Sequence, residues 1–300
     1  MRSLKTPLIS NGYELSQAPE RLGWLEPSDP AASLNTLKAQ YHEQGYLWLK
    51  HFLDRAEVLA FRQRFFSAFQ NTGLLKAGSD PLDGLYGGGG EDAREAQKIL
   101  VALARSAAYE AFCLQPRIWQ FYDAFFGGTS YLHKRKIIRY TKPGDPLATA
   151  AHYDLVYLRG GTDRVCSSWL PLGDIPVEMG GLLYLENSDA TGRRLEAEFS
   201  RKNAELPPEE RISAFNKNMT EGGWVSKDLP AMAERFRSRW LVADYEAGDM
   251  IVHSAYMIHA AAMNNDPQGR LRLSTDIRYQ NVEDEIDARW NAHWSLDDML

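Results

Sequence analysis

The chain has 300 residues, of which 44% are hydrophobic and 11% aromatic, and its formal net charge at pH 7 is −6. This composition supports a sizeable core and excludes an intrinsically disordered protein, while the acidic balance argues against a nucleic-acid binder. With only two cysteines and no apolar stretch suited to a signal peptide or a membrane span, the chain is expected to be cytoplasmic and to have no membrane partner.

Helical signals come first along the chain. Asp54 is suited to cap a helix whose third position is Glu57, and apolar residues at helical spacing follow up to Phe69. A second helical region is predicted over residues 91–126 from apolar residues three or four positions apart. Residues 35–130 are therefore expected to form a helical support that packs outside a barrel.

Strand-like runs dominate from residue 131 onward. They fall at residues 136–140, 154–158, 165–170, 181–186, 250–252 and 271–279. Many strands after a helical part predict one domain, 1–300, of mainly β class: a jelly roll with helical support. Its core is expected to comprise residues 131–188 and 241–281.

Residues 189–240 interrupt the strand pattern. They are rich in charge and are predicted to be an insertion with short helices. Connections of this length are often lids or binding loops, and the alternative is a surface or dimer-forming excursion. The sequence leaves both interpretations open, and with them the question of a homodimer.

A His-x-Asp motif at His152 and Asp154 is followed far along the chain by His259. In a strand, side chains two positions apart point to the same side, so His152 and Asp154 are expected to bind one ion while Tyr153 faces away. Two imidazoles and one carboxylate are the ligands of non-haem Fe(II) oxygenases, in which they leave three positions open. His253 is the rival third ligand, and we interpret it as a polar residue near the cavity rim.

An arginine and a serine share one face of the last predicted strand. Arg272 and Ser274 are two positions apart, as are Arg270 and Arg272. A planar guanidinium binds carboxylates in bidentate fashion, so this face suits a dicarboxylate co-substrate such as 2-oxoglutarate.

At these residues the chain resembles the phytanoyl-CoA dioxygenase family of Fe(II)/2-oxoglutarate oxygenases. The resemblance covers roughly residues 35–300 apart from one divergent stretch. It is carried by Glu43–Asp54, Ser168–Asp174, Met179–Ser188, Gly248-Asp249 and Arg278-Tyr279, in addition to the ligand motif. It implies a double-stranded β-helix, an Fe(II) site, and 2-oxoglutarate and O2 as co-substrates.

Carried over residue by residue, the resemblance makes His152, Asp154 and His259 the iron ligands. Counting back from Arg278-Tyr279 makes Arg272 the partner of the distal carboxylate, with Ser274 beside it, whereas counting forward from His259 falls nearer Arg270. Further candidate co-substrate contacts are Trp169, Arg139 and Tyr140. For Trp169 a plain core role is the alternative.

The resemblance implies a dioxygenase that hydroxylates, desaturates or cyclises a small-molecule metabolite while 2-oxoglutarate is decarboxylated to succinate. Asp154 argues against halogenation, because halogenating relatives lack this carboxylate and bind chloride there. The alternative is a cupin-like metal-binding protein or isomerase that does not use 2-oxoglutarate, against which the Arg272–Ser274 pair argues. The substrate itself is left open.

Overall fold

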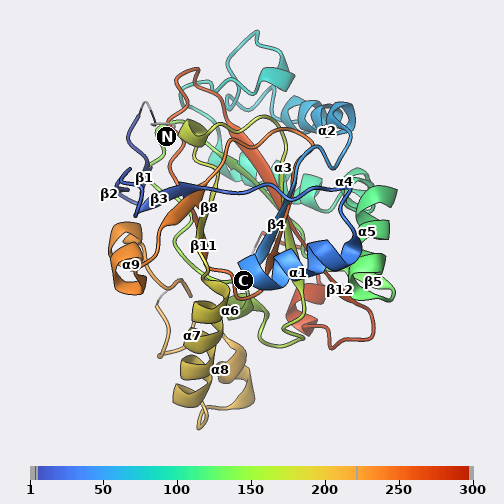
Figure 1. The fold of residues 1–300 in the computed structure, drawn as a ribbon. Coiled ribbons are helices and arrows are strands. Elements are labelled where there is room, and N and C mark those ends of the chain that lie inside the picture. The colour runs from blue at the N-terminus through green and yellow to red at the C-terminus, as the bar shows by residue number, and fades with distance from the viewer. Residues whose placement is uncertain (1–3, 5, 221, 297–300) are drawn as a thin grey trace.

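The structure is a computed structural model that describes residues 4, 6–220 and 222–296. Two β-sheets form its centre (Figure 1). The larger sheet has the strand order β4 (Tyr46–Leu49), β10 (Met250–Ser254), β7 (Cys166–Pro171), β12 (Arg272–Asn281) and β5 (Ser130–Leu132), and β6 (Ile137–Thr141) also pairs with β12. The smaller sheet has the order β11 (His259–Ala261), β8 (Leu182–Leu185), β9 (Trp240–Val242) and β3 (Leu22–Trp24).

The later strands pass from one sheet to the other. β7, β10 and β12 belong to the larger sheet, and β8, β9 and β11, which lie between them in the sequence, belong to the smaller one. Neighbours among these six strands pair antiparallel. This winding is that of a double-stranded β-helix, so the predicted fold class is confirmed. A small hairpin of β1 (Ile9–Ser10) and β2 (Tyr13–Glu14) precedes it.

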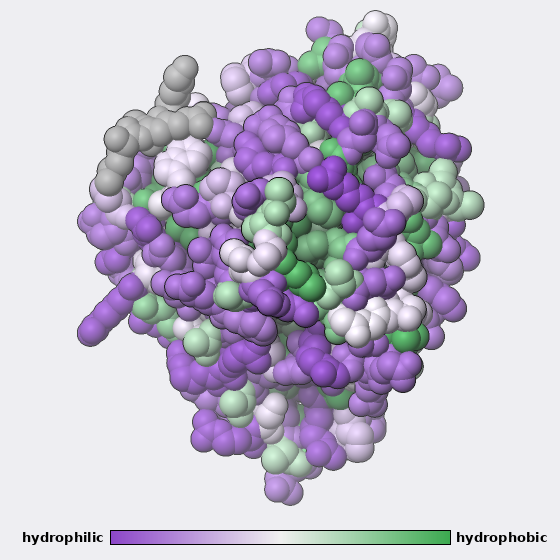
Figure 2. All heavy atoms as spheres, turned by 45° about the vertical axis from the view of Figure 1, so that its right-hand side comes forward, coloured by the Kyte–Doolittle hydropathy of each residue, from purple (hydrophilic) through white to green (hydrophobic). Residues whose placement is uncertain are grey.

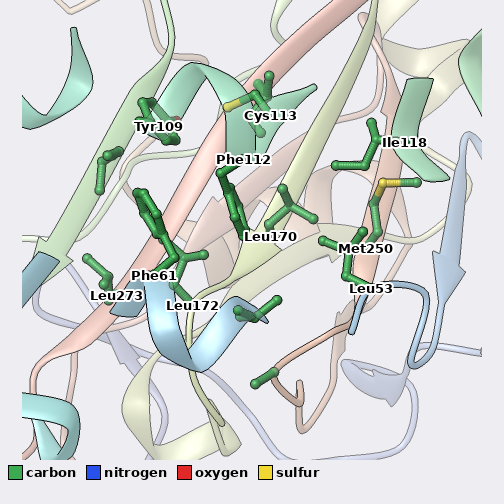
Figure 3. Packing of buried hydrophobic residues seen from close by; sticks show 14 of the residues in the cluster. Leu53, Phe61, Tyr109, Phe112, Cys113, Ile118, Leu170, Leu172, Met250 and Leu273 are labelled. Carbon is green, nitrogen blue, oxygen red and sulfur yellow. The ribbon is translucent and has the colours of Figure 1, made fainter. Parts of the chain in front are cut away.

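Five helices from the first part of the chain lie on one side of the sheets (Figure 1). They are α1 (Leu34–Gln44), α2 (Arg55–Ser67), α3 (Ala93–Ala104), α4 (Ala107–Cys113) and α5 (Pro116–Phe126). The Asp54 side chain accepts a hydrogen bond from the backbone N–H of Glu57, as the capping pattern predicted. Figure 3 shows how helical Phe61 and Phe112 pack with Leu170 and Leu273 of the larger sheet. Burial of these aromatic rings holds the helices on the outer face of that sheet.

The segment predicted as a strand at residues 154–158 is instead a short helix. α6 (Leu155–Leu158) begins directly after Asp154, whose backbone is already helical at φ −64° and ψ −29°. Its apolar residues are buried in the cluster between the smaller sheet and the insertion. A short buried apolar run has no periodicity that separates a strand from a helix, which is why the prediction was wrong here.

Residues 189–240 contain three helices. α7 (Asp189–Lys202) has 14 residues, which is longer than predicted, and α8 (Pro208–Ile212) and α9 (Leu229–Phe236) are shorter. α7 and α8 project away from the helices of the first part of the chain (Figure 1). Short 3-10 turns lie at Pro81–Asp83, Val177–Met179 and Ala288–Asn291. Across the described residues, none of the helices has the length and apolar character needed to cross a membrane.

Candidate active site

The side chains of His152, Asp154 and His259 come together between the two sheets. One ligand atom from each can be chosen so that all lie within 4.8 Å of one another. The Nε2 atoms of His152 and His259 are 3.6 and 3.7 Å from Asp154 Oδ1. Asp154 and His259 are buried and the His152 side chain is 12% exposed, so the group is largely shielded from bulk water.

Backbone pairing sets the two imidazoles beside each other. His152 and His259 form an antiparallel bridge in which each N–H donates to the other's carbonyl oxygen, at 3.0 and 2.9 Å. Each Nδ1 lies next to a backbone carbonyl, that of Ala150 at 2.8 Å and that of Met257 at 2.9 Å. Because a carbonyl oxygen can only accept, each Nδ1 is the donor in these contacts, and each Nε2 faces the carboxylate.

Asp154 reaches the imidazoles from a turn and not from a strand. It precedes α6, so the two-residue alternation that we expected for His152 and Asp154 is not the reason for their meeting. Tyr153 nevertheless faces away, as expected, and its hydroxyl donates to Glu196 of α7 at 2.8 Å. Arg159 holds the same carboxylate with contacts of 2.6 and 2.8 Å. The insertion is thus tied to the loop that carries two of the three candidate ligands.

The Asp154 carboxylate is kept ionised by its neighbours. Burial alone would raise its pKa, but Arg278 and hydrogen bonds from His152 and His253 outweigh burial and hold the pKa well below its usual range. Ser167 also donates to Oδ2. Burial lowers the pKa of His259, helped by His152 and His253, so this imidazole is neutral at physiological pH. A carboxylate and neutral imidazoles are the protonation states that bind divalent metals.

His253 does not lie at a cavity rim, and that interpretation was wrong. Its side chain is buried in β10, with Nδ1 2.8 Å from the Tyr184 hydroxyl and Nε2 3.3 Å from Asp154 Oδ2. β10 lies within the larger sheet between β4 and β7, and Tyr184 of the opposite sheet covers the His253 ring. Within the described residues, the metal-binding geometry is formed by His152, Asp154 and His259, and His253 supports the carboxylate from behind.

A small polar pocket adjoins the triad. Its volume is about 30 Å³, and Arg272, Ser274 and Trp169 line it together with the three candidate ligands. Arg272 Nε and Ser274 Oγ are buried and have no hydrogen-bond partner among the described residues. By contrast, Arg270 makes a two-pronged contact with Asp266 at 3.0 and 2.7 Å and lies outside this pocket.

The other candidate co-substrate contacts differ in their surroundings. Trp169 borders the small pocket and also packs on Tyr245, at 4.8 Å between ring centroids, so its position is compatible with both interpretations. Arg139 pairs with Ser274 across β6 and β12 and borders the pocket, but its side chain is half exposed and contacts Asp276 at 3.4 Å. Tyr140 alternates to the other face of β6, where its ring packs on Phe65 and Phe69 of α2. Its position does not favour a co-substrate contact.

A larger cavity of about 730 Å³ opens from the same triad toward solvent. Tyr157 and the insertion residues Phe215 and Trp224 line it, as do the late residues Trp290 and Trp294. The molecular surface is mostly hydrophilic in the view of Figure 2. Two of the few large apolar side chains that are exposed among the described residues, Leu147 at 70% and Phe215 at 50%, border this cavity.

Arg278 was predicted only as part of the Arg278-Tyr279 motif and not as a residue of the site. Its Nη2 is 3.3 Å from Asp154 Oδ1, and the residue lines both the small pocket and the large cavity. A signal for it was present, because Arg278 has the same strand parity as Arg272 and Ser274 on β12.

A family model described as phytanoyl-CoA dioxygenase (PhyH) matches residues 41–271. The chain belongs to the phytanoyl-CoA dioxygenase family. This match spans both candidate ligand segments and ends one residue before Arg272. The resemblance seen in the sequence is thereby confirmed.

Solved structures with the same fold include SnoN, SnoK and EctD. The epimerase SnoN, in complex with Fe3+, alpha ketoglutarate and nogalamycin RO, is 21% identical, with 86% of this chain and 87% of that chain covered and a TM-score of 0.53. The alpha ketoglutarate dependent carbocyclase SnoK from nogalamycin biosynthesis is 19% identical, with 87% and 89% covered and a TM-score of 0.54. EctD from S. alaskensis with bound Fe is 15% identical, with 89% and 83% covered and a TM-score of 0.52.

Proposed function

We propose that this member of the phytanoyl-CoA dioxygenase family is an Fe(II)- and 2-oxoglutarate-dependent dioxygenase acting on a small-molecule metabolite. The observation that carries the proposal is the donor set itself. Two imidazoles present Nε2 toward one ionised carboxylate, and the three ligand atoms lie within 4.8 Å of one another in a largely buried site. This set fits Fe(II), for which His152, Asp154 and His259 would be the ligands.

The polar lining of the small pocket suits the distal carboxylate of the second co-substrate. 2-Oxoglutarate has a carboxylate at each end, and the unpartnered Arg272 Nε and Ser274 Oγ are donors suited to the distal one. Burial lowers the pKa of Arg272 to about 10, which still leaves the guanidinium cationic at neutral pH. Trp169 would form an apolar wall of the same pocket.

When bound, Fe(II), 2-oxoglutarate and O2 supply the oxidation, with release of succinate and carbon dioxide. The residues of the chain hold the reactants and limit the access of water. Ser167, His253 and Arg278 fix the Asp154 carboxylate, and the large cavity would orient one C–H bond of the substrate toward the triad. A hydroxylation, or a desaturation or cyclisation, is the expected outcome, and SnoN and SnoK are described as an epimerase and a carbocyclase on this same fold.

We further propose that the whole chain works as one domain and that residues 189–240 act as its lid. Phe215 and Trp224 border the cavity mouth, and the Tyr157 hydroxyl donates to the Gly222 carbonyl at 2.8 Å. α7 is anchored through Glu196, so the part that would move is the stretch after α8. A segment in this position would shield the reacting centre from solvent.

The direct test is anaerobic reconstitution of the full chain with Fe(II) and 2-oxoglutarate. A visible charge-transfer band is expected on mixing, followed by succinate release once O2 and a substrate from a metabolite screen are added. Mass detection of an added oxygen or a loss of two hydrogens identifies the reaction. Metal binding with no band and no succinate would instead indicate a cupin-like metal protein that does not use 2-oxoglutarate.

A further inference from the structure

The Arg278 guanidinium has hydrogen-bonding capacity that nothing described in the structure uses. The residue is 5% exposed, its Nη2 contacts Asp154 Oδ1 at 3.3 Å, and its Nε and Nη1 have no hydrogen-bond partner among the described residues. One face of the guanidinium stacks on the Trp290 ring, 4.5 Å from its centroid. Buried unpartnered N–H groups are costly, so the free Nη1 of a residue that lines the cavity indicates a missing acceptor.

The charges of the inner site point to the same conclusion. A divalent metal and Arg272 together would carry three positive charges, and Asp154 and 2-oxoglutarate together three negative ones. Arg278 then adds one positive charge that no group in this set balances. Although Arg278 contacts Asp154, that carboxylate would also bind the metal, so the buried site keeps an excess positive charge and an anion is expected to accompany the substrate.

Two other basic residues of the cavity wall are already paired with carboxylates. Arg139 contacts Asp276 at 3.4 Å, and Lys142 contacts the buried carboxylate of Glu91. Asp145 lies near the entrance, half-buried, and accepts a hydrogen bond from the backbone of the loop that carries it. Arg278 is therefore the cation at the inner end of the cavity that remains to be matched.

Aromatic rings line the space in front of this arginine. Tyr157, Trp224, Trp290 and Trp294 border the cavity, and its volume of about 730 Å³ is within the range of small-molecule sites. Flat aromatic walls favour a flat or cyclic apolar body. A ligand with such a body and one acidic group would satisfy both the walls and the cation.

We propose that the substrate of this site is a cyclic organic acid whose carboxylate binds Arg278 through its free Nη1. The proposal rests on the function proposed above and specifies its substrate class. Arg278 is six residues after Arg272 on β12, about 20 Å along the strand, so the two arginines approach the triad from opposite sides. The carboxylate of the substrate would thus be held on the side away from the distal end of 2-oxoglutarate.

The experiment compares acids with their neutral amides. Benzoate, 1-naphthoate and indole-3-acetate, each with the matching amide, are titrated by calorimetry into the full chain with Fe(II) and 2-oxoglutarate in the absence of O2. At least one acid is expected to bind about tenfold or more tightly than its amide, which is the effect of a charge-assisted hydrogen bond. Arg278→Gln should reduce this preference to about twofold or less, and Arg278→Lys, which keeps the charge, should give an intermediate value.

Arg164→Gln is the matched control. Arg164 pairs with Asp284 on the surface and lies outside the cavity, so its removal changes the net charge equally and should leave the preference intact. Binding of no acid, equal binding of acid and amide, or a preference that survives Arg278→Gln in a folded variant would overturn the proposal. A loss of 2-oxoglutarate affinity in Arg278→Gln without any acid preference in the wild type would assign Arg278 to the co-substrate instead.

The charge-transfer band separates failure of this inference from failure of the proposed function. A normal band without acid preference defeats only the substrate class. If no band forms, the proposed function fails, and the same titrations on the metal-free chain decide about the anion site. A preference that depends on Arg278 there supports the site, and its absence overturns it.

Discussion

The small pocket and the large cavity meet at the same triad but are built in different ways. The small pocket has a volume of about 30 Å³ and is lined mainly by polar residues on strands, such as Arg272 and Ser274 of β12. The large cavity has about 730 Å³, and loops, the insertion and the end of the chain supply its aromatic walls. Residues that would hold the co-substrate therefore lie on the rigid sheet. Residues that would select the substrate lie mainly on loops, which can vary between proteins of the same fold.

Because both cavities meet at the triad, a single substitution there should have the largest effect on activity. His259→Ala is expected to abolish the charge-transfer band and succinate release, because a metal held by two protein ligands loses its geometry. His253→Ala should keep the band and lower the metal affinity by about 10- to 100-fold, the usual effect of a residue that supports a ligand. Anaerobic titration with Fe(II) measures both. If the His253 variant lost the band and the His259 variant kept it, the third ligand would be His253.

The next prediction concerns the small pocket and compares Arg272, which lines it, with Arg270, which does not. Arg272→Ala should weaken 2-oxoglutarate binding by about 2 kcal/mol, since a buried charge-assisted contact to the distal carboxylate is lost. Arg270→Ala removes an arginine that is bound to Asp266 and should have much less effect on that affinity. Titration of 2-oxoglutarate into each Fe(II)-loaded variant gives the ranking. The reverse order would place the co-substrate beside Arg270.

Breaking the contact between α7 and the loop that carries His152 and Asp154 should have a smaller effect, seen as a loss of stability. Tyr153→Phe removes the hydrogen bond to Glu196, a buried contact to a carboxylate, and should lower the free energy of unfolding by about 1.5 kcal/mol. Urea unfolding measures this loss. Tyr157→Phe is a suitable control, because its hydroxyl bonds a neutral carbonyl of the insertion at 2.8 Å and should cost less. Equal values for the two variants would argue against a special role of Glu196 as the anchor of α7.

The same contrast explains what the sequence could predict. The alternation of Arg272 and Ser274 predicts a shared face because β12 is a regular strand of ten residues. His152 and Asp154 were selected for their chemistry, but the structure joins them through a turn whose helical backbone no periodicity signals. The burial of His253 depends on strands that pair with β10 from distant parts of the chain. Contacts of that kind cannot be read from local patterns.

The aromatic walls of the large cavity were the hardest part of the site to predict from the sequence. Phe215 and Trp224 belong to a stretch with little regular structure, and Trp290 comes from beyond the last strand. Which of these rings face the triad is decided by tertiary packing alone. Arg278 is an intermediate case, since its strand parity was visible but its orphaned N–H groups were not. The sequence therefore suggests the class of reaction, whereas a proposal for the substrate class needs the structure.

The last prediction concerns the mouth of the large cavity and should have the smallest effect. Phe215 is 50% exposed and borders the cavity, so Phe215→Ala should cost little stability but remove an apolar contact to the substrate. We expect KM for the substrate to rise about threefold to fivefold, corresponding to partial loss of one aromatic contact, with 2-oxoglutarate affinity unchanged. Succinate formed per product should also increase if the ring helps to close the site.

Leu114→Ala is the control for this variant, because Leu114 is a similarly exposed apolar residue, at 37%, that does not border the cavity. It should leave KM and coupling as in the wild type. A point change is preferable to removal of the loop between Lys202 and Lys217, since Asn203 and Asn216 within it are buried and hydrogen-bonded to the backbone. Unchanged KM and coupling in Phe215→Ala would mean that this part of the insertion is not a lid, and that the walls formed by Trp290 and Trp294 act without it.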